Sequence, residues 1–381
     1  MGGASFRKRA GRLLRRIERG PLGRKARAFV ERHRRTMPVV FFFGGVAWDA
    51  LTLRRIDAVF DNLVLFVYLT LAGGLIVAGA LVASGRLRRP WTERYGAWIP
   101  PAIQFLLGAL FSAYVVFYAR SVSSTETSLY LVVLVALLVG NEFVHRRAAN
   151  VYVLLALYFL AAFSFFVFFL PVVTKRIDDG MFLAGGLVSL ALLGAMIAFL
   201  RVRRALGGRQ SVYAFGLVVG LFGLMNLFYH RNWIPPVPLA LRDGGVFHQV
   251  RREGTAFVLR YEPVPGRYWV DSDRRFRYAE GDTVYCFTAV FAPTELTTKV
   301  FHAWAYFDEA RGTWVETDRI GYALVGGRDH GYRGVTWKRY VHPGAWRVEV
   351  VTGTGRVLGR IRFRIEAAPA APRRWRERRY E

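Results

Sequence analysis

Five charged side chains lie close together near the start of the chain, between two apolar segments. Asp49, Arg54, Arg55, Asp57 and Asp61 fall within 13 residues. Charged groups inside a membrane are energetically expensive and mark functional sites by default. Asp57 and Asp61 are four residues apart and would share a helix face. The cluster is therefore either an ion or proton site, or an ion-paired hairpin that locks two helices together, and the hairpin is the simpler interpretation.

A second polar pair has the spacing of metal ligands. Glu142 and His145 form a Glu-x-x-His sequence, which is the ligand spacing of di-iron helical bundles. Those bundles need two such pairs and two further glutamates, and the apolar part of the sequence holds no second pair. Two arginines follow His145 directly, and their charge repels a metal ion. We therefore interpret the pair as an ordinary helix end, and we expect no metal and no cofactor.

Basic residues near a glycine-rich stretch form the first candidate ligand-binding group. Arg328, Arg333 and Lys338 lie in or near residues 326–334. Glycine lets backbone amides approach a ligand closely, and arginine suits planar anions. A lipid phosphate or an acidic glycan would fit such a loop. The alternative is a turn-rich loop whose charges are solvated.

His302 and Trp304 form the second candidate group. They are two residues apart in a predicted strand, so both side chains point to the same face. They either contribute to a ligand site or form a core aromatic pair with a hydrogen-bonded histidine. Ser272 is the only serine after Ser211, and Cys286 lies in an alternating strand without basic neighbours. A nucleophile beside a base is therefore not expected, and we predict no catalytic residue and no enzyme activity.

Seven apolar segments are candidate membrane spans, since a helix needs about 20 apolar residues to cross the hydrocarbon layer. They are residues 37–53, 58–83, 98–119, 129–144, 151–173, 181–200 and 212–229. The first and the fourth are short for a span. Apolar residues make up 53% of the chain, and their excess is concentrated here. The pattern predicts an α-helical transmembrane bundle of about seven spans over residues 37–230.

The distribution of arginine predicts the orientation of this bundle. Lys and Arg number 23 in the stretches on one side of the predicted spans and 5 on the other. Positively charged short loops stay in the cytoplasm. The N-terminus is therefore predicted to be cytoplasmic and the C-terminal domain extracytoplasmic, in a bacterial inner membrane.

Residues 1–36 form a basic arm, with 13 basic and 2 acidic residues. The arm either lies as a helix on anionic lipid of the inner leaflet or serves as a solvated topology signal. The whole chain has a net charge of +27. Because this charge lies beside predicted membrane spans, we expect anionic membrane lipid as a partner, and no nucleic acid.

The rest of the chain has the pattern of a β domain. Residues 231–244 form a proline-rich linker, residues 245–367 alternate apolar and polar positions, and residues 368–381 form a basic tail that we expect to be disordered. The predicted strands are 246–252, 255–261, 283–291, 298–307, 314–323, 346–352 and 357–365. Seven or eight short strands at this spacing predict an all-β sandwich of immunoglobulin type.

Several pieces of residues 285–366 resemble a bacterial family, the domain of unknown function 2914. The pieces include Cys-Phe-Thr-Ala-Val at 286–290, His-Ala-Trp at 302–304, Gly-Ala-Trp-Arg-Val-Glu-Val at 344–350 and Gly-Arg-Val-Leu-Gly-Arg-Ile-Arg-Phe at 355–363. Residues 44–49 and 55–57 look like the uncharacterised multi-span domain often fused to this family. The resemblance implies an envelope protein, and it implies no activity because the family has no assigned chemistry.

Two classes of function follow from these patterns. The first is a membrane protein whose outer sandwich binds an envelope component (an anionic lipid headgroup, a glycan or a protein) in a scaffold or sensing role. The alternative is a transporter or channel subunit with the charged cluster at its mouth, and an enzyme acting on lipid-linked substrates ranks last. Gly216-x-x-x-Gly220 allows close helix contact within the bundle or between copies, so a homo-oligomer also remains open.

Overall fold

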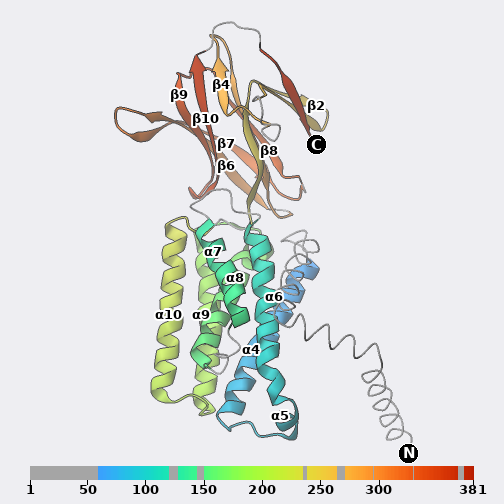
Figure 1. Ribbon diagram of the computed structural model, residues 1–381, viewed down its shortest axis with the longest axis vertical. Helices are drawn as coiled ribbons and strands as arrows, with labels where there is room; N and C mark the ends of the chain where they lie inside the picture. The colour runs from blue at the N-terminus through green and yellow to red at the C-terminus, as the bar shows by residue number, and fades with distance from the viewer. Residues whose placement is uncertain are drawn as a thin grey trace, which may run out of the picture. The chain divides into compact units, whose positions relative to one another are not determined.

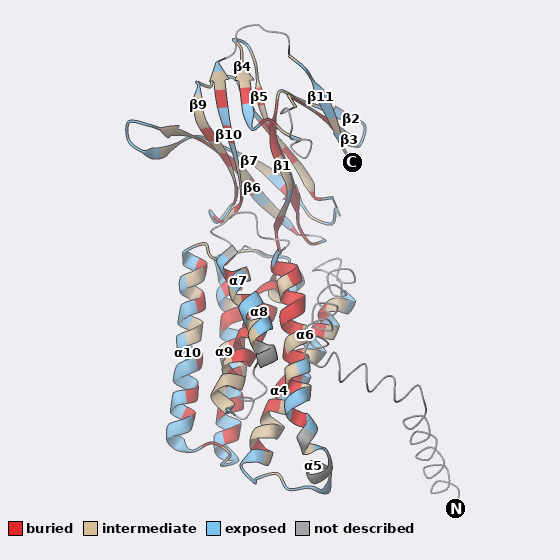
Figure 2. Cartoon of the chain, in the orientation of Figure 1, coloured by how far each residue is buried: buried red, intermediate tan, exposed pale blue. Residues whose placement is uncertain are grey.

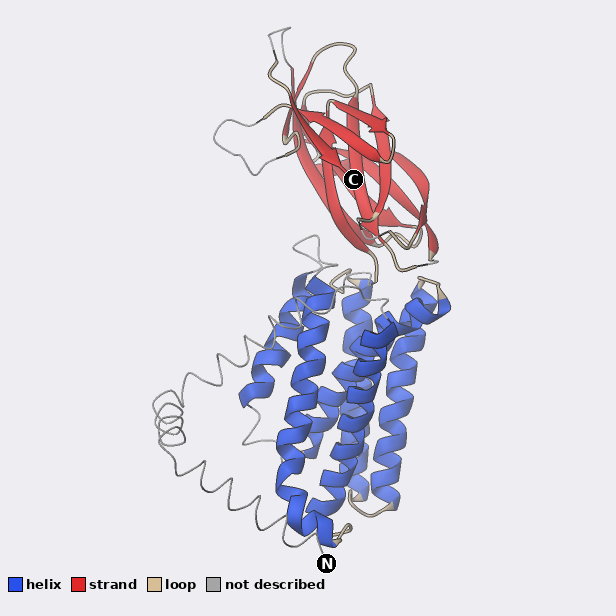
Figure 3. Ribbon diagram, turned by 90° about the vertical axis from the view of Figure 1, so that its right-hand side faces the viewer, coloured by secondary structure: helices blue, strands red, loops and turns tan. Residues whose placement is uncertain are grey.

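The computed structural model describes residues 59–119, 128–143, 150–234, 238–263, 271–294, 296–328, 330–367 and 373–381. The predicted basic arm, the first predicted span (37–53), His145 and four members of the charged cluster (Asp49, Arg54, Arg55 and Asp57) lie outside the described residues. Helices make up the first part of the described chain and strands the second (Figures 1 and 3).

Within the described residues, six of the seven predicted spans are helices. They are α4 (Val59–Ala83), α6 (Ile99–Ala119), α7 (Ser128–Phe143), α8 (Val151–Thr174), α9 (Asp179–Val202) and α10 (Gly208–His230), with α5 (Pro90–Tyr95) and the 3-10 helix η1 (Gly96–Trp98) between α4 and α6. Of the six helices that match predicted spans, the five other than α7 are long and apolar enough to cross a membrane. α7 has 16 residues, which is short for a span. A helical region of membrane-spanning type is therefore confirmed, whereas the number seven stays a prediction.

α8 is the central helix of the bundle. It packs against α4, α6, α9 and α10, and its aromatic side chains Phe159, Phe163, Phe165 and Phe168 are fully buried. α8 is largely buried within the described chain, whereas α10 is largely exposed, as Figure 2 shows for α10. Because α10 is apolar yet exposed, its outer face is suited to lipid.

Close approach between helices depends on glycines other than the predicted pair. A Cβ on Gly185 of α9 would lie 3.0 Å from the backbone of Phe166 in α8, so a larger residue would force the two helices slightly apart. Gly216 and Gly220 on α10 are exposed, and a Cβ on either would meet nothing in the described chain within 4 Å. This pair therefore makes no packing contact inside the described bundle, and its role between copies stays a prediction.

Eleven strands follow in the described part of the chain. They are β1 (Ala240–Phe247), β2 (Gln249–Glu253), β3 (Ala256–Tyr261), β4 (Arg275–Tyr278), β5 (Val284–Phe291), β6 (Thr297–Asp308), β7 (Thr313–Val325), β8 (Tyr332–Lys338), β9 (Gly344–Thr352), β10 (Val357–Ala367) and β11 (Arg376–Tyr380). They form three sheets with the orders β1-β5-β8, β4-β10-β9-β6-β7 and β11-β3-β2. The pairing of β4 with β10 is parallel, and the other pairings are antiparallel. The predicted β-rich C-terminal region is thus confirmed.

The sheet β1-β5-β8 lies between the other two sheets. On one face, Cys286 of β5 packs with Trp304 and Trp346 of the five-stranded sheet. On the other face, Phe287 of β5 packs with Leu259 of β3. β5 is therefore apolar along nearly its whole length, as expected for a strand that is buried on both sides.

Three boundaries in the strand region differ from the predictions. The predicted strand 246–252 is broken at His248, and its two parts, β1 and β2, belong to different sheets. β1 begins at Ala240, inside the predicted linker. β8 begins at Tyr332, inside the predicted glycine-rich loop. These strands pair with partners far away in the sequence, so local alternation alone did not define their limits.

The basic tail contains a strand, contrary to the prediction of disorder. β11 pairs antiparallel with β3, and the ring of Tyr380 packs edge-on against Phe287 with 5.2 Å between centroids. Arg378 forms ion pairs with Asp243 and Asp271. A high density of charge favours disorder when a segment is considered alone. Here distant carboxylates and a distant aromatic surface hold the segment in place.

Candidate functional site

His302 lies at the centre of a buried polar network between two sheets. Its Nε2 is 2.8 Å from Thr288 Oγ1, and its Nδ1 is 2.8 Å from Thr336 Oγ1. Trp304 Nε1 donates to the same Thr336 oxygen at 3.2 Å, and the Tyr322 hydroxyl lies 3.0 Å from Thr288 Oγ1. His302 and Trp304 thus face the neighbouring sheet rather than solvent, which favours the core interpretation of this pair.

The electrostatics of His302 agree with a structural role. Within the described residues, the side chains that hydrogen-bond to it are uncharged, and burial lowers the pKa of His302 to about 4. The ring is therefore neutral near pH 7 and offers one donor and one acceptor. The threonine hydroxyls on its two sides complete both hydrogen bonds. The network links β6 to β5 and β8 across the core.

The three basic residues predicted as a ligand site do not converge. Arg328 lies in the loop before β8, with its guanidinium carbon 5.0 Å from the centroid of the Tyr332 ring. Arg333 and Lys338 are five residues apart on β8, so they lie on opposite faces of the strand. The Lys338 ammonium pairs with the Asp318 carboxylate. An anion site composed of Arg328, Arg333 and Lys338 is therefore not assembled in this structure.

The remaining candidates form no catalytic arrangement within the described residues. Asp61 lies in the first described turn of α4. Cys286 is buried, and burial raises the pKa of its thiol, which disfavours the reactive thiolate. No group of three or more His, Cys, Asp or Glu side chains in the described chain could hold a metal ion. The absence of catalysis, metal and cofactor stays a prediction.

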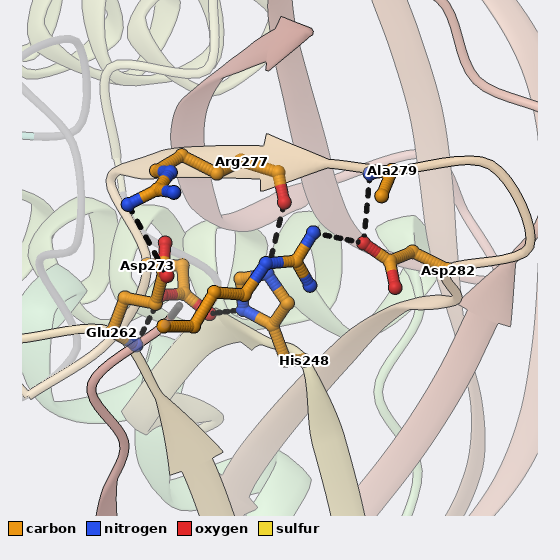
Figure 4. A network of polar contacts seen from close by, with 7 residues as sticks. His248, Glu262, Asp273, Arg277, Ala279 and Asp282 are labelled. Atoms are coloured by element: carbon orange, nitrogen blue, oxygen red, sulfur yellow. Dashed lines mark hydrogen bonds and ion pairs between the residues drawn. The ribbon is translucent and has the colours of Figure 1, made fainter. Parts of the chain in front are cut away.

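A second histidine, which the sequence analysis did not single out, makes a buried contact with a carboxylate (Figure 4). His248 Nδ1 lies 2.8 Å from Asp273 Oδ2, and His248 Nε2 lies 3.2 Å from the carbonyl oxygen of Arg277. A carbonyl oxygen only accepts, so Nε2 carries a hydrogen. The other carboxylate oxygen of Asp273 accepts from the Glu262 N–H at 2.8 Å. The imidazole stacks on Phe276 with 3.8 Å between ring centroids.

This pair braces the corner between β1 and β2. Burial raises the pKa of Asp273, against the effect of its hydrogen bond with His248. Burial also acts to raise the pKa of nearby Asp282, but the hydrogen bonds from Arg373 and from the Ala279 N–H outweigh burial, and that pKa is lowered. Both nitrogens of His248 and both oxygens of Asp273 are engaged within the protein. The arrangement therefore fixes the chain at the corner between β1 and β2.

A buried arginine joins the strand region to the ends of two helices. Arg356, in the turn between β9 and β10, is 8% exposed. Its guanidinium donates to the carbonyl oxygen of Tyr229 and to Asn232 Oδ1 (3.0 Å), and it pairs with Asp179 Oδ1 at 3.4 Å. The guanidinium carbon lies 3.6 Å from the centroid of the Tyr229 ring, and the Tyr229 hydroxyl donates to Asp179 at 2.6 Å. We call these four residues the Arg356 junction.

Apolar packing supports the Arg356 junction from both sides. The Tyr229 ring stacks on Phe182 of α9, with 3.6 Å between centroids. Ile177, between α8 and α9, packs on the core of the strand region that contains Leu358. No sequence pattern predicted the Arg356 junction. The available signal was the position of Arg356 in the last piece that resembles the family, but nothing in the sequence pairs it with Asp179.

An exposed aromatic group lies at one end of the sheet β1-β5-β8. Trp337 on β8 stands opposite Tyr285 on β5, with 6.4 Å between ring centroids, and is 57% exposed. Tyr340, three residues later, is 91% exposed. The Tyr278 hydroxyl donates to the carbonyl oxygen of Arg339 at 2.8 Å, which fixes the segment between the two exposed rings. We call Tyr285 and Trp337 the aromatic patch.

The helices and sheets together define a class: a chain with a membrane-type helical region followed by a β-rich region. Residues 297–365 match the sequence model of a family described as protein of unknown function (DUF2914). This match confirms the predicted resemblance for that segment. No curated protein matches the chain.

Two solved structures have weak similarity to the chain. One is an immunoglobulin-like protein from Pseudomonas aeruginosa, with 12% identity and a TM-score of 0.21, covering 34% of this chain and 98% of its own. The other is the Pseudomonas fluorescens alkylpurine DNA glycosylase bound to DNA containing an abasic site analog, with 10% identity and a TM-score of 0.21, covering 82% of this chain and 100% of its own. At these scores neither similarity bears on function.

Proposed function

We propose that this chain is a multi-pass protein of a bacterial inner membrane that holds an immunoglobulin-like sandwich outside the cytoplasm, where the sandwich binds an envelope component in a scaffold or sensing role. Five helices of membrane-spanning length support the membrane location. The excess of arginine on one side of the spans supports a cytoplasmic N-terminus. The binding role does not involve catalysis.

The observation that carries this proposal is the aromatic patch. Single exposed apolar side chains are common, but aromatic rings that lie side by side on the surface are suited to an interaction site. An aromatic face provides apolar contact while a tyrosine hydroxyl offers a hydrogen bond. A sugar ring has one face rich in C–H groups and a rim of hydroxyls, which suits the same combination. We therefore take an envelope glycan as the ligand class, with a lipid headgroup or a protein as the alternatives.

The Arg356 junction supports the sensing role. Arg356 is buried against Asp179 and Tyr229. A displacement of β9 and β10 would therefore change the contacts at the start of α9 and the end of α10. A ligand shifts such an equilibrium only if it binds the two states differently. The proposal therefore requires that ligand affinity changes when this junction is broken.

The direct test measures binding of soluble envelope glycan fragments to the full chain in lipid nanodiscs. We expect wild-type binding and a loss of roughly tenfold or more in affinity for Trp337→Ala, as for the central aromatic of an interface. Ile320→Ala is the matched control, because Ile320 is also exposed on a strand, β7, outside the aromatic patch.

The outcomes separate the ligand classes. Equal binding by Trp337→Ala and Ile320→Ala would refute the aromatic patch as the site. If the glycans do not bind but anionic vesicles or an envelope protein bind through Trp337, the glycan class is wrong and the patch is retained. An absence of binding to all three would refute the binding role.

The transporter or channel alternative ranks second. The described part of the charged cluster is Asp61 alone, and the centre of the bundle is filled by aromatic side chains such as Phe111, Phe163 and Phe168. An ion pathway normally needs more polar groups along it. Ion flux in proteoliposomes that depends on Asp61 would reverse this ranking.

A further inference from the structure

A cavity of about 560 Å³ lies between the ends of several helices. Its walls come from the end of α4, from η1 and the start of α6, from the start of α8, from the connection between α9 and α10, and from the first turn of α10. This volume falls within the range of roughly 300–1,000 Å³ that small-molecule sites occupy. Most of its lining is apolar, and the lining includes Ile76, Gly79, Ile99, Ile103, Leu154 and Leu206.

Positive charge is concentrated in two of the segments that line this cavity. Residues 84–90 and 201–210 contain seven arginines and no acidic residue, and these arginines are exposed. Ser84, Ala205 and Gln210 line the cavity and belong to these two stretches. Two of the segments that line the apolar cavity therefore also carry exposed arginines, at one end of the bundle.

We infer that this cavity binds an anionic phospholipid, with acyl carbons inside the cavity and the phosphate among the arginines. Guanidinium groups bind phosphate oxygens in a planar, bidentate geometry. Basic pockets between membrane helices bind anionic headgroups for this reason. A zwitterionic lipid offers the same apolar part but no net charge to the arginines. The site is independent of the basic arm and of the aromatic patch.

The test uses the purified full chain in detergent, with phosphatidylglycerol and phosphatidylcholine of identical acyl chains as probes. Native mass spectrometry counts bound lipid, and a titration gives the affinity. We expect retention of phosphatidylglycerol and much weaker retention of phosphatidylcholine. Glycerol 3-phosphate, as the free anionic headgroup analogue, is expected not to bind.

Two variants address the two halves of the site. Gly96 lines the cavity, its φ is −57°, and a Cβ there would meet nothing described within 4 Å. Gly96→Leu should therefore occupy the cavity without backbone strain and lower phosphatidylglycerol affinity. Gly74→Leu is the matched control, because Gly74 also has open space around its Cβ position but does not line the cavity.

Substitution of two arginines tests the role of charge and leaves the lining of the cavity unchanged. The double variant Arg203→Gln, Arg209→Gln should lower phosphatidylglycerol affinity by roughly thirtyfold, at the usual contribution of each basic residue near a charged headgroup. Arg364→Gln, an exposed position on β10, serves as the control. Equal affinity for the two lipids, strong binding of glycerol 3-phosphate, or unchanged affinity in both test variants would overturn the inference.

Discussion

Lowering the pH is expected to destabilise the strand region through one buried side chain, His302. The ordinary pKa of histidine is 6.5, and burial lowers the pKa of His302 to about 4 in the folded protein. Between these two values the unfolded chain takes up a proton that the folded chain does not. The free energy of unfolding is therefore fully retained above pH 6.5 and falls as the pH is lowered towards 4.

The size of this effect follows from the difference between the two pKa values. One pKa unit corresponds to about 1.4 kcal/mol, so the shift from 6.5 to about 4 amounts to about 3 kcal/mol. This is a large share of the stability of a single domain, which is roughly 5–15 kcal/mol. In the described part of the chain, the partners Thr288, Thr336 and Tyr322 are uncharged, so they offer no ion pair to the buried imidazolium.

The assay compares wild type with His302→Gln in detergent by denaturant unfolding at several pH values. Tryptophan fluorescence reports on this region, because Trp304 and Trp346 are buried in it. Other carboxyl groups, including Asp273 and Asp282, titrate in both proteins. The difference between the two pH profiles therefore isolates the contribution of His302.

We expect the wild type to lose about 3 kcal/mol more than His302→Gln between about pH 7.5 and about pH 4. The variant is expected to be less stable at pH 7.5, because it loses the fit of the imidazole between two threonines. Parallel pH profiles for the two proteins would refute the reasoning, since they would mean that His302 has the same pKa in both states.

Three other outcomes are expected. Arg356→Gln should destabilise the protein by roughly 2 kcal/mol, because it loses the charged hydrogen bonds to Asp179 and its neighbours. The same variant should show faster hydrogen exchange in the turn between β9 and β10. An unchanged exchange rate in this turn would contradict the structural role of Arg356. Cys286 should resist maleimide in the native state and react only on unfolding, because it is buried and the pKa of its thiol is raised. Gly326→Ala should lower the free energy of unfolding by about 1–3 kcal/mol, because the new Cβ would lie 1.8 Å from a backbone carbonyl oxygen. Gly353→Ala should leave the free energy of unfolding nearly unchanged. Thermal unfolding of both variants measures the difference.

The helical region was predicted well because a membrane span is a local property. Length and apolar composition alone define a span, and α8 (Val151–Thr174) begins at the predicted residue. α10 begins four residues earlier than predicted, at Gly208. The first turn of α10 is helical but polar, so the apolar pattern did not include it in the predicted span.

The strand region was predicted less completely because its limits depend on distant partners. β11 looked like a disordered basic tail, yet it pairs with β3, more than 100 residues earlier. The break at His248 depends on Asp273, 25 residues away. The same reason explains the candidate sites. His302 and Trp304 are two residues apart in one strand, so the sequence correctly predicted that they share a face. No local pattern indicated that Arg356 would contact Asp179.

β11 has a practical consequence for anyone who shortens the chain. The family match ends at residue 365, which makes that point an attractive place to stop. Such a truncation would leave one edge of β3 open and remove the ring of Tyr380 from Phe287. Open strand edges beside aromatic surface favour pairing between molecules. A soluble fragment should therefore extend through Glu381, and a purification tag at that end needs a flexible spacer.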